Sequence, residues 1–103
     1  MSQTVRIAAK SDLPPLGETR EFDAAGRMIC VANVDGEFRA LDNTCLHHGA
    51  PLGQAGVVAD GKVICAWHAW AWDAQTGACG HDPTRRLRTY ALRLEGDDVL
   101  VEI

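Results

Sequence analysis

Short stretches of alternating apolar and polar residues, separated by tight-turn signals, constrain the fold of this chain most strongly. Two dipeptides, Asp35-Gly36 and Asp60-Gly61, are of the kind favoured in two-residue turns between antiparallel strands. The pattern predicts strands over Thr4–Ala9, Gly17–Ala24, Arg27–Val34, Glu37–Leu41, Gly56–Ala59, Lys62–Ile64, Trp70–Asp73, Leu87–Leu94 and Val99–Ile103. We expect the apolar third stretch to be central and the polar second one to lie at an edge. With no convincing helical pattern, the predicted fold class is all-β, an antiparallel sandwich or barrel.

The size and charge of the chain exclude several classes of protein. With 103 residues and 47% apolar content, it is long enough for one domain with a modest core. No run approaches the roughly 20 apolar residues of a membrane span, and the N-terminus lacks an apolar secretory segment, so a cytoplasmic location is expected. The net charge is −4 and the largest basic group is Arg85, Arg86 and Arg88. Nucleic acid is therefore a poor candidate partner, because phosphate binding needs a concentrated basic face.

Two stretches combine cysteine and histidine at close spacing. They are CLHHGAPL at residues 45–52 and CAWHAWAWD at residues 65–73. Each follows a predicted strand, and loops that leave a rigid β scaffold can converge on one ion or cluster. In a cytosolic chain such pairs indicate a metal site more often than disulfide bonds.

The two adjacent histidines of the first stretch leave the kind of metal open. With His48, the pattern is Cys45-x2-His48 and Cys65-x2-His68, a symmetric set that tetrahedral zinc accepts. With His47, it becomes Cys45-x-His47 and, after seventeen intervening residues, Cys65-x2-His68.

In the second register the sequence resembles the Rieske iron–sulfur family. The match extends beyond the four ligand positions: Gly49, Leu52 and Gly53 resemble the turn of the family's first cluster loop, and Thr76-Gly77 with Pro83 resembles the approach to its third loop. The final LRTYALRLEGDDVLVEI is similar to the closing hairpin of the family. The resemblance thus covers the chain from about residue 4 to its end.

This resemblance implies one [2Fe–2S] cluster, with Cys45 and Cys65 on one iron and His47 and His68 on the other. It also implies a single Rieske-type domain over residues 1–103, with a small cluster-binding subdomain formed by loops at about 43–54 and 63–73. Histidine ligands give such centres reduction potentials of roughly −150 to +300 mV, compared with about −400 mV for plant-type ferredoxins. No Ser or Tyr lies between Cys65 and Trp72 to donate to cluster sulfur, so a value toward the low end is expected.

Within the family, the respiratory branch carries two further cysteines that form a disulfide bond. The corresponding residues here are Ala50 and Trp67, so the chain is similar to the bacterial Rieske ferredoxins that serve ring-hydroxylating oxygenases. The resemblance implies a soluble carrier, not itself an enzyme and without catalytic residues. It would pass electrons from an NAD(P)H-dependent reductase to a terminal oxygenase. The alternatives are the small subunit of an assimilatory nitrite reductase and a zinc-stabilised β interaction module.

The remaining candidate residues have simpler interpretations. Trp70 and Trp72 lie two positions apart on a strand and are expected to pack against the core. Cys30, inside an apolar strand, is interpreted as a small buried hydrophobic residue, and Cys79 as a free thiol. We expect the other conspicuous polar residues to lie on surface loops or a solvated strand face: His48, His81, Arg85, Arg86 and Arg88.

Overall fold

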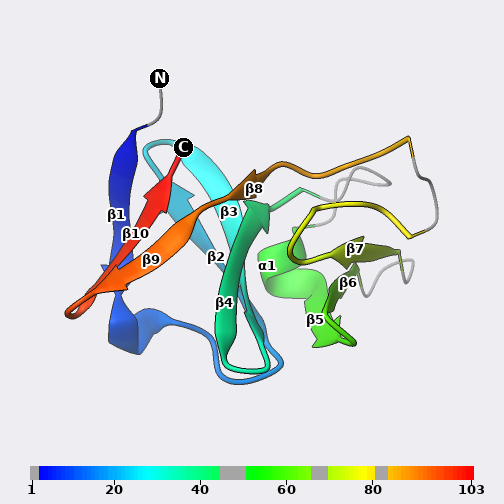
Figure 1. Ribbon diagram of the computed structural model, residues 1–103, viewed down its shortest axis with the longest axis horizontal. Coiled ribbons are helices and arrows are strands. Elements are labelled where there is room, and N and C mark those ends of the chain that lie inside the picture. Colours follow the sequence, from blue (N-terminus) through cyan, green and yellow to red (C-terminus); the bar gives the residue numbers. More distant parts are fainter. Residues whose placement is uncertain (1–2, 45–50, 66–69, 81–83) are drawn as a thin grey trace.

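The structure of the protein, a computed structural model, describes residues 3–44, 51–65, 70–80 and 84–103. These residues form three small antiparallel sheets joined by tight turns (Figure 1). The first sheet contains, in spatial order, β1 (Thr4–Ala9), β10 (Asp98–Glu102) and β9 (Leu92–Glu95). The second contains β2 (Thr19–Ala24), β3 (Arg27–Val34), β4 (Glu37–Asp42) and β8 (Thr89–Tyr90). The third sheet contains β5 (Gly56–Ala59), β6 (Lys62–Cys65) and β7 (Ala71–Asp73), and the helical turns are η1 (Lys10–Asp12) and α1 (Leu52–Ala55).

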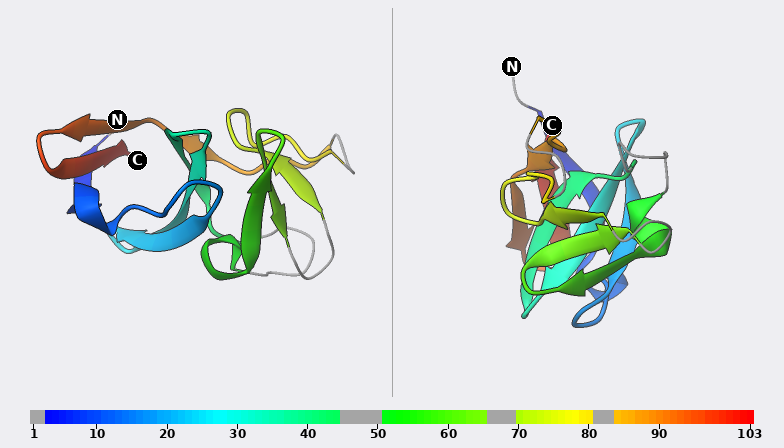
Figure 2. Two further views of the ribbon diagram at one scale, coloured as in Figure 1. Left: turned by 90° about the horizontal axis from the view of Figure 1, so that it is seen from below. Right: turned by 90° about the vertical axis from the view of Figure 1, so that its right-hand side faces the viewer.

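The first two sheets curve around a common interior, and the third sheet packs beside them (Figure 2). Strand β3 connects the curved sheets to the third sheet, because both of its faces are buried in hydrophobic cores. Ile29 and Val31 belong to the interior of the two curved sheets, whereas Cys30 and Ala32 belong to a second core that also contains Cys65. Double burial explains why this strand is a nearly continuous apolar run and not an alternating one.

The all-β prediction is confirmed, and most strand ranges shift by only one or two residues. As expected, β3 lies between two neighbours and β2 lies at an edge of its sheet. The prediction of one strand over Leu87–Leu94 is wrong, because this segment forms two short strands. Strand β8, which ends at Tyr90, pairs with β4, and β9, which begins at Leu92, pairs with β10. The single-turn helix α1 was also not expected. No helix of the described residues is long and apolar enough to cross a membrane.

The backbone conformation of Gly77 leads to a stability prediction. Its φ is +78°, and an added Cβ would overlap the carbonyl group of Leu87, whose N–H donates to the Gly77 carbonyl oxygen at 2.9 Å. Gly61 has a similar φ of +74° but open space around it. We expect Gly61→Ala to cost about 1–2 kcal/mol of unfolding free energy through strain alone. Gly77→Ala should cost about 2–5 kcal/mol because steric overlap is added.

Urea unfolding of the two variants and the wild-type protein measures this difference. Equal losses at the two positions would show that overlap between a Cβ at position 77 and the carbonyl group of Leu87 adds no cost beyond backbone strain.

Candidate metal centre

The first Cys/His stretch leaves the end of β4 and returns to the fold through α1. Thr44 and Pro51 form an antiparallel bridge, so the chain is paired on both sides of residues 45–50. Next to this bridge, the backbone N–H of Leu52 donates to the carbonyl oxygen of Asn43 at 2.6 Å. The backbone N–H of Gly53 donates to Asn43 Oδ1 at 2.8 Å. A buried amide side chain thus closes the base of the first stretch.

The second stretch connects β6 to β7. Cys65 is the last residue of β6, its side chain is completely buried, and its backbone N–H donates to the carbonyl oxygen of Trp70 at 2.8 Å. One residue earlier, Ile64 pairs with Ala71 across the ladder. The base of this stretch is therefore also closed by hydrogen bonds.

The bases of the two stretches adjoin in space. Gly56, the residue after α1, is the register partner of Cys65, and Leu52 packs in the same core as Cys65. In Figure 1, α1, β5 and β6 lie together at one side of the molecule. The fold therefore brings together the bases of two stretches that are separated in sequence. Three of the predicted ligands, Cys45, His47 and His68, lie outside the described residues.

A third segment, residues 77–80, lies against the same small sheet. Cys79 forms an isolated antiparallel β-bridge with Trp72. The backbone N–H of Gly80 donates to the carbonyl oxygen of Ala71 at 2.9 Å. The predicted third loop continues through His81 and Pro83, both outside the described residues. All three segments that the sequence connected with the site thus adjoin the β5–β6–β7 sheet. The first leads into β5 through α1, the second joins β6 to β7, and the third lies against β7.

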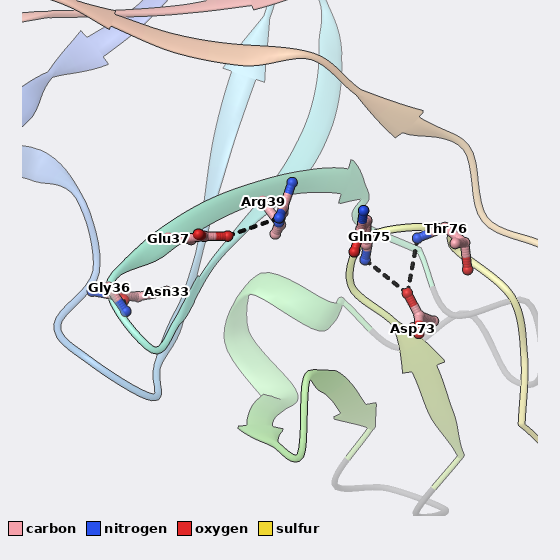
Figure 3. Close-up of polar contacts among 7 residues, drawn as sticks. All are labelled: Asn33, Gly36, Glu37, Arg39, Asp73, Gln75 and Thr76. Carbon is pink, nitrogen blue, oxygen red and sulfur yellow. Dashed lines mark hydrogen bonds and ion pairs between the residues drawn. The ribbon is translucent and has the colours of Figure 1, made fainter.

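Asp73 organises the turn that leads from β7 into the third segment. Its Oδ1 accepts hydrogen bonds from the backbone N–H groups of Thr76 and Gln75, both at 2.9 Å. These donors, chiefly Thr76, hold the pKa of the Asp73 carboxyl below its ordinary value. Figure 3 shows this turn across from the Glu37–Arg39 ion pair of β4, which has an N–O distance of 2.8 Å. The carboxylate thus sets the path toward the third loop.

Comparison with known proteins identifies the family. A model described as the Rieske [2Fe-2S] domain matches residues 3–91. The chain belongs to the Rieske [2Fe–2S] domain family. Its cofactor is accordingly a [2Fe–2S] cluster.

Two curated relatives of this Rieske domain are ferredoxin components of dioxygenases. The biphenyl 2,3-dioxygenase ferredoxin component of Rhodococcus jostii (strain RHA1) is 38% identical over 95% of this chain and 91% of its own length. The biphenyl dioxygenase ferredoxin subunit of Pseudomonas sp. (strain KKS102) is 34% identical over 96% of this chain and 92% of its own length.

Solved structures resemble the Rieske domain over nearly its whole length. The ferredoxin of carbazole 1,9a-dioxygenase from Nocardioides aromaticivorans IC177 has a TM-score of 0.83 and 28% identity, covering 96% of each chain. A chain in the complex of reduced oxygenase and oxidised ferredoxin of carbazole 1,9a-dioxygenase has a TM-score of 0.79 and 26% identity, covering 95% of this chain and 91% of that one. The putative nitrite reductase small subunit from Mycobacterium tuberculosis has a TM-score of 0.88 and 21% identity, covering 100% of this chain and 96% of that one, which shows a shared fold alone.

The surroundings of Cys65 suit a sulfur-rich cluster. The thiol lies in a core with Trp72, whose Nε1–H is buried without a hydrogen-bond partner among the described residues. An unpaired buried donor is costly in a purely apolar core, whereas sulfide and thiolate can accept from it. Cys30, in the same core, differs because burial, reinforced by the negative charge of Glu21, raises the pKa of its thiol to about 12. It therefore stays protonated and is poorly suited to metal binding.

Several interpretations of neighbouring residues are confirmed. Trp72 is completely buried and Trp70 packs against the same core, with 6.2 Å between the ring centroids. Cys30 and Cys79 are buried, and no disulfide bond joins the cysteines of the described residues. The three arginines of the basic group are exposed. Sequence reasoning missed Asn43 and Glu21, which hold the first stretch, because an isolated polar residue in a strand or turn has no motif that marks it.

The cofactor leads to an analytical prediction. The purified protein should contain about two irons and two acid-labile sulfides per chain. A rhombic spin signal should appear only after reduction, because the two ferric irons of the oxidised cluster couple to zero net spin and one added electron leaves an unpaired spin. Iron and sulfide analysis with electron paramagnetic resonance measures both. Stoichiometric zinc, in protein from iron-replete cells, would contradict this prediction.

Proposed function

We propose that Cys45, His47, Cys65 and His68 hold one [2Fe–2S] cluster between the two loops. The pairing of Gly56 with Cys65 carries the proposal, because it sets the bases of both Cys/His stretches side by side. The spacing Cys45-x-His47 and Cys65-x2-His68 supports this set of ligands, and the family match supports the cofactor. We treat residues 1–103 as one domain built around this site.

When bound, the cluster supplies a one-electron redox centre, with thiolates on one iron and neutral imidazoles on the other. The protein's own residues hold and shield it. The buried position of Cys65 keeps one side of the site dry, which strengthens the effect of nearby charges and dipoles on the potential. The closed bases of both stretches limit how far the ligands can move when the charge changes.

We further propose that the protein is an electron carrier between an NAD(P)H-dependent reductase and a terminal aromatic-ring-hydroxylating oxygenase. The names of the two relatives support this role, as does the structural likeness to a ferredoxin seen in complex with its oxygenase. We assign no catalytic residue, and we propose a cytoplasmic location because NAD(P)H is available there. The nitrite reductase small subunit has weaker support, since the likeness to one is below 25% identity.

The basic group beside the third segment is the surface we expect to steer docking. Arg86 is exposed, and its backbone is fixed by a bridge to Ala78. The guanidinium of Arg88 lies 4.9 Å from the ring centroid of Tyr90, which restricts its motion. The chain has a net charge of −4, so these cations form a local positive surface. We expect this surface to attract a partner with acidic residues near its own cofactor.

Substitution of the proposed ligands tests the site. His47→Ala and His68→Ala should each lose the cluster or most of it, because imidazole supplies half of the ligands. His48→Ala should retain it and is the matched control. Visible absorbance per chain and iron content measure retention. If His48→Ala is bleached while His47→Ala stays coloured, the ligand register is wrong.

A three-component assay tests the carrier role. Product should form only when reductase, this protein and oxygenase are all present. At low ionic strength Arg86→Glu should lower the rate by about tenfold, and the loss should shrink at high salt as charges are screened. Lys10→Glu makes the same charge change on η1, far from the third segment, and should have little effect. Equal product without this protein would contradict the carrier role.

A further inference from the structure

Glu21 of β2 connects to both sides of the first Cys/His stretch. Its Oε2 accepts a hydrogen bond from Asn43 Nδ2 at 2.8 Å, and its Oε1 accepts one from Gln54 Nε2 at 2.6 Å. Asn43 precedes the stretch, and Gln54 follows it on α1. One carboxylate therefore links Asn43, which precedes residues 45–50 in the sequence, to Gln54, which follows them.

Neighbouring contacts make this arrangement stiff. A Cβ on Gly53 would come within 2.5 Å of the Cβ and backbone N of Glu21, so only glycine allows α1 to approach β2 this closely. The hydroxyl of Thr19, also on β2, reaches the carbonyl oxygens of Leu52 at 2.9 Å and Gly56 at 3.2 Å. The position of Glu21 relative to the stretch is thus set by backbone contacts and does not depend on flexible side chains alone.

In the described part of the chain, no hydrogen-bond or ion-pair partner balances the charge of Glu21. Both of its donors are neutral amides, and within the described residues it takes part in no ion pair. The carboxylate is half-buried and its charge is felt in the adjacent core, where it adds to the burial that raises the pKa of Cys30. Cys65 lies in that same core.

We propose that Glu21 is a positioning residue of the cluster site, which fixes the first loop through Asn43 and Gln54 and lowers the reduction potential of the centre with its charge. Reduction adds one electron to the centre, and a fixed negative charge nearby in a region of low dielectric constant disfavours it. This inference rests on the proposed assignment of Cys45 and His47 as ligands.

Two substitutions of Glu21 separate geometry from charge. Glu21→Gln can keep an acceptor for Asn43 and offer a donor to Gln54, whose amide group can turn over to accept it. It should raise the reduction potential, while a chelator removes the cluster at the wild-type rate. Glu21→Ala removes both hydrogen bonds, so the chelator should remove the cluster about tenfold faster. Redox titration and the kinetics of bleaching with a chelator provide the two measurements.

Glu18→Gln is the matched control, because it removes the same charge from an exposed residue just before β2. It should leave both measurements unchanged. If Glu21→Gln has the wild-type potential, Glu21 does not tune the centre, and if Glu21→Ala loses the cluster no faster than Glu21→Gln, it does not position the loop. Absence of a [2Fe–2S] spectrum in the wild-type protein would instead contradict the proposed function.

A substitution at exposed Gln54 tests the charge without changing Glu21. Gln54→Lys places an ammonium group next to the carboxylate and should raise the potential in the wild-type background. The Glu21→Gln/Gln54→Lys double variant should have a higher potential than either single variant, because the effects of two fixed charges on the centre add. An unchanged potential in Gln54→Lys would show that a charge at this place does not reach the centre, which would overturn the electrostatic part of the proposal.

Discussion

The close approach of α1 to β2 is the contact on which the geometry of the centre depends. It requires Gly53, because any side chain there would collide with Glu21. With the backbones in contact, Asn43 can reach the N–H of Gly53, and Thr19 can reach the carbonyl oxygens at both ends of α1. The packing of α1 on β2 leads the chain directly into β5, whose first residue, Gly56, pairs with Cys65.

The central strand β3 determines how firmly the β5–β6–β7 sheet is attached to the rest of the molecule. Its alternate side chains fill two different cores, one between the curved sheets and one that contains Cys65. Since a close-packed interior resists small displacements, a strand shared by two cores couples them rigidly. A carrier benefits from this arrangement, because a site held by a rigid scaffold changes little between its oxidised and reduced states.

Two polar groups of the described residues act in opposite directions on an added electron. The buried Nε1–H of Trp72 carries a positive hydrogen into the core that contains Cys65, and a donor of this kind favours the more negative, reduced state. The carboxylate of Glu21 disfavours it. These two residues belong to different sheets. Their effects reach one place only because α1 and β3, the neighbour of β2, pack in one core with the third sheet.

Local sequence was sufficient for those features that depend on neighbours along the chain. The Asp35-Gly36 and Asp60-Gly61 turns, the apolar run of β3 and the spacing of cysteine and histidine in each stretch all arise from residues a few positions apart. By contrast, the split of the predicted strand Leu87–Leu94 into β8 and β9 depends on which distant strand pairs with each half. The hydrogen bonds of Glu21 join residues 22 and 33 positions apart. Such partners are chosen only when α1 settles on β2, because a carboxylate in an isolated strand has no preference among distant amides until packing removes water and fixes their separation.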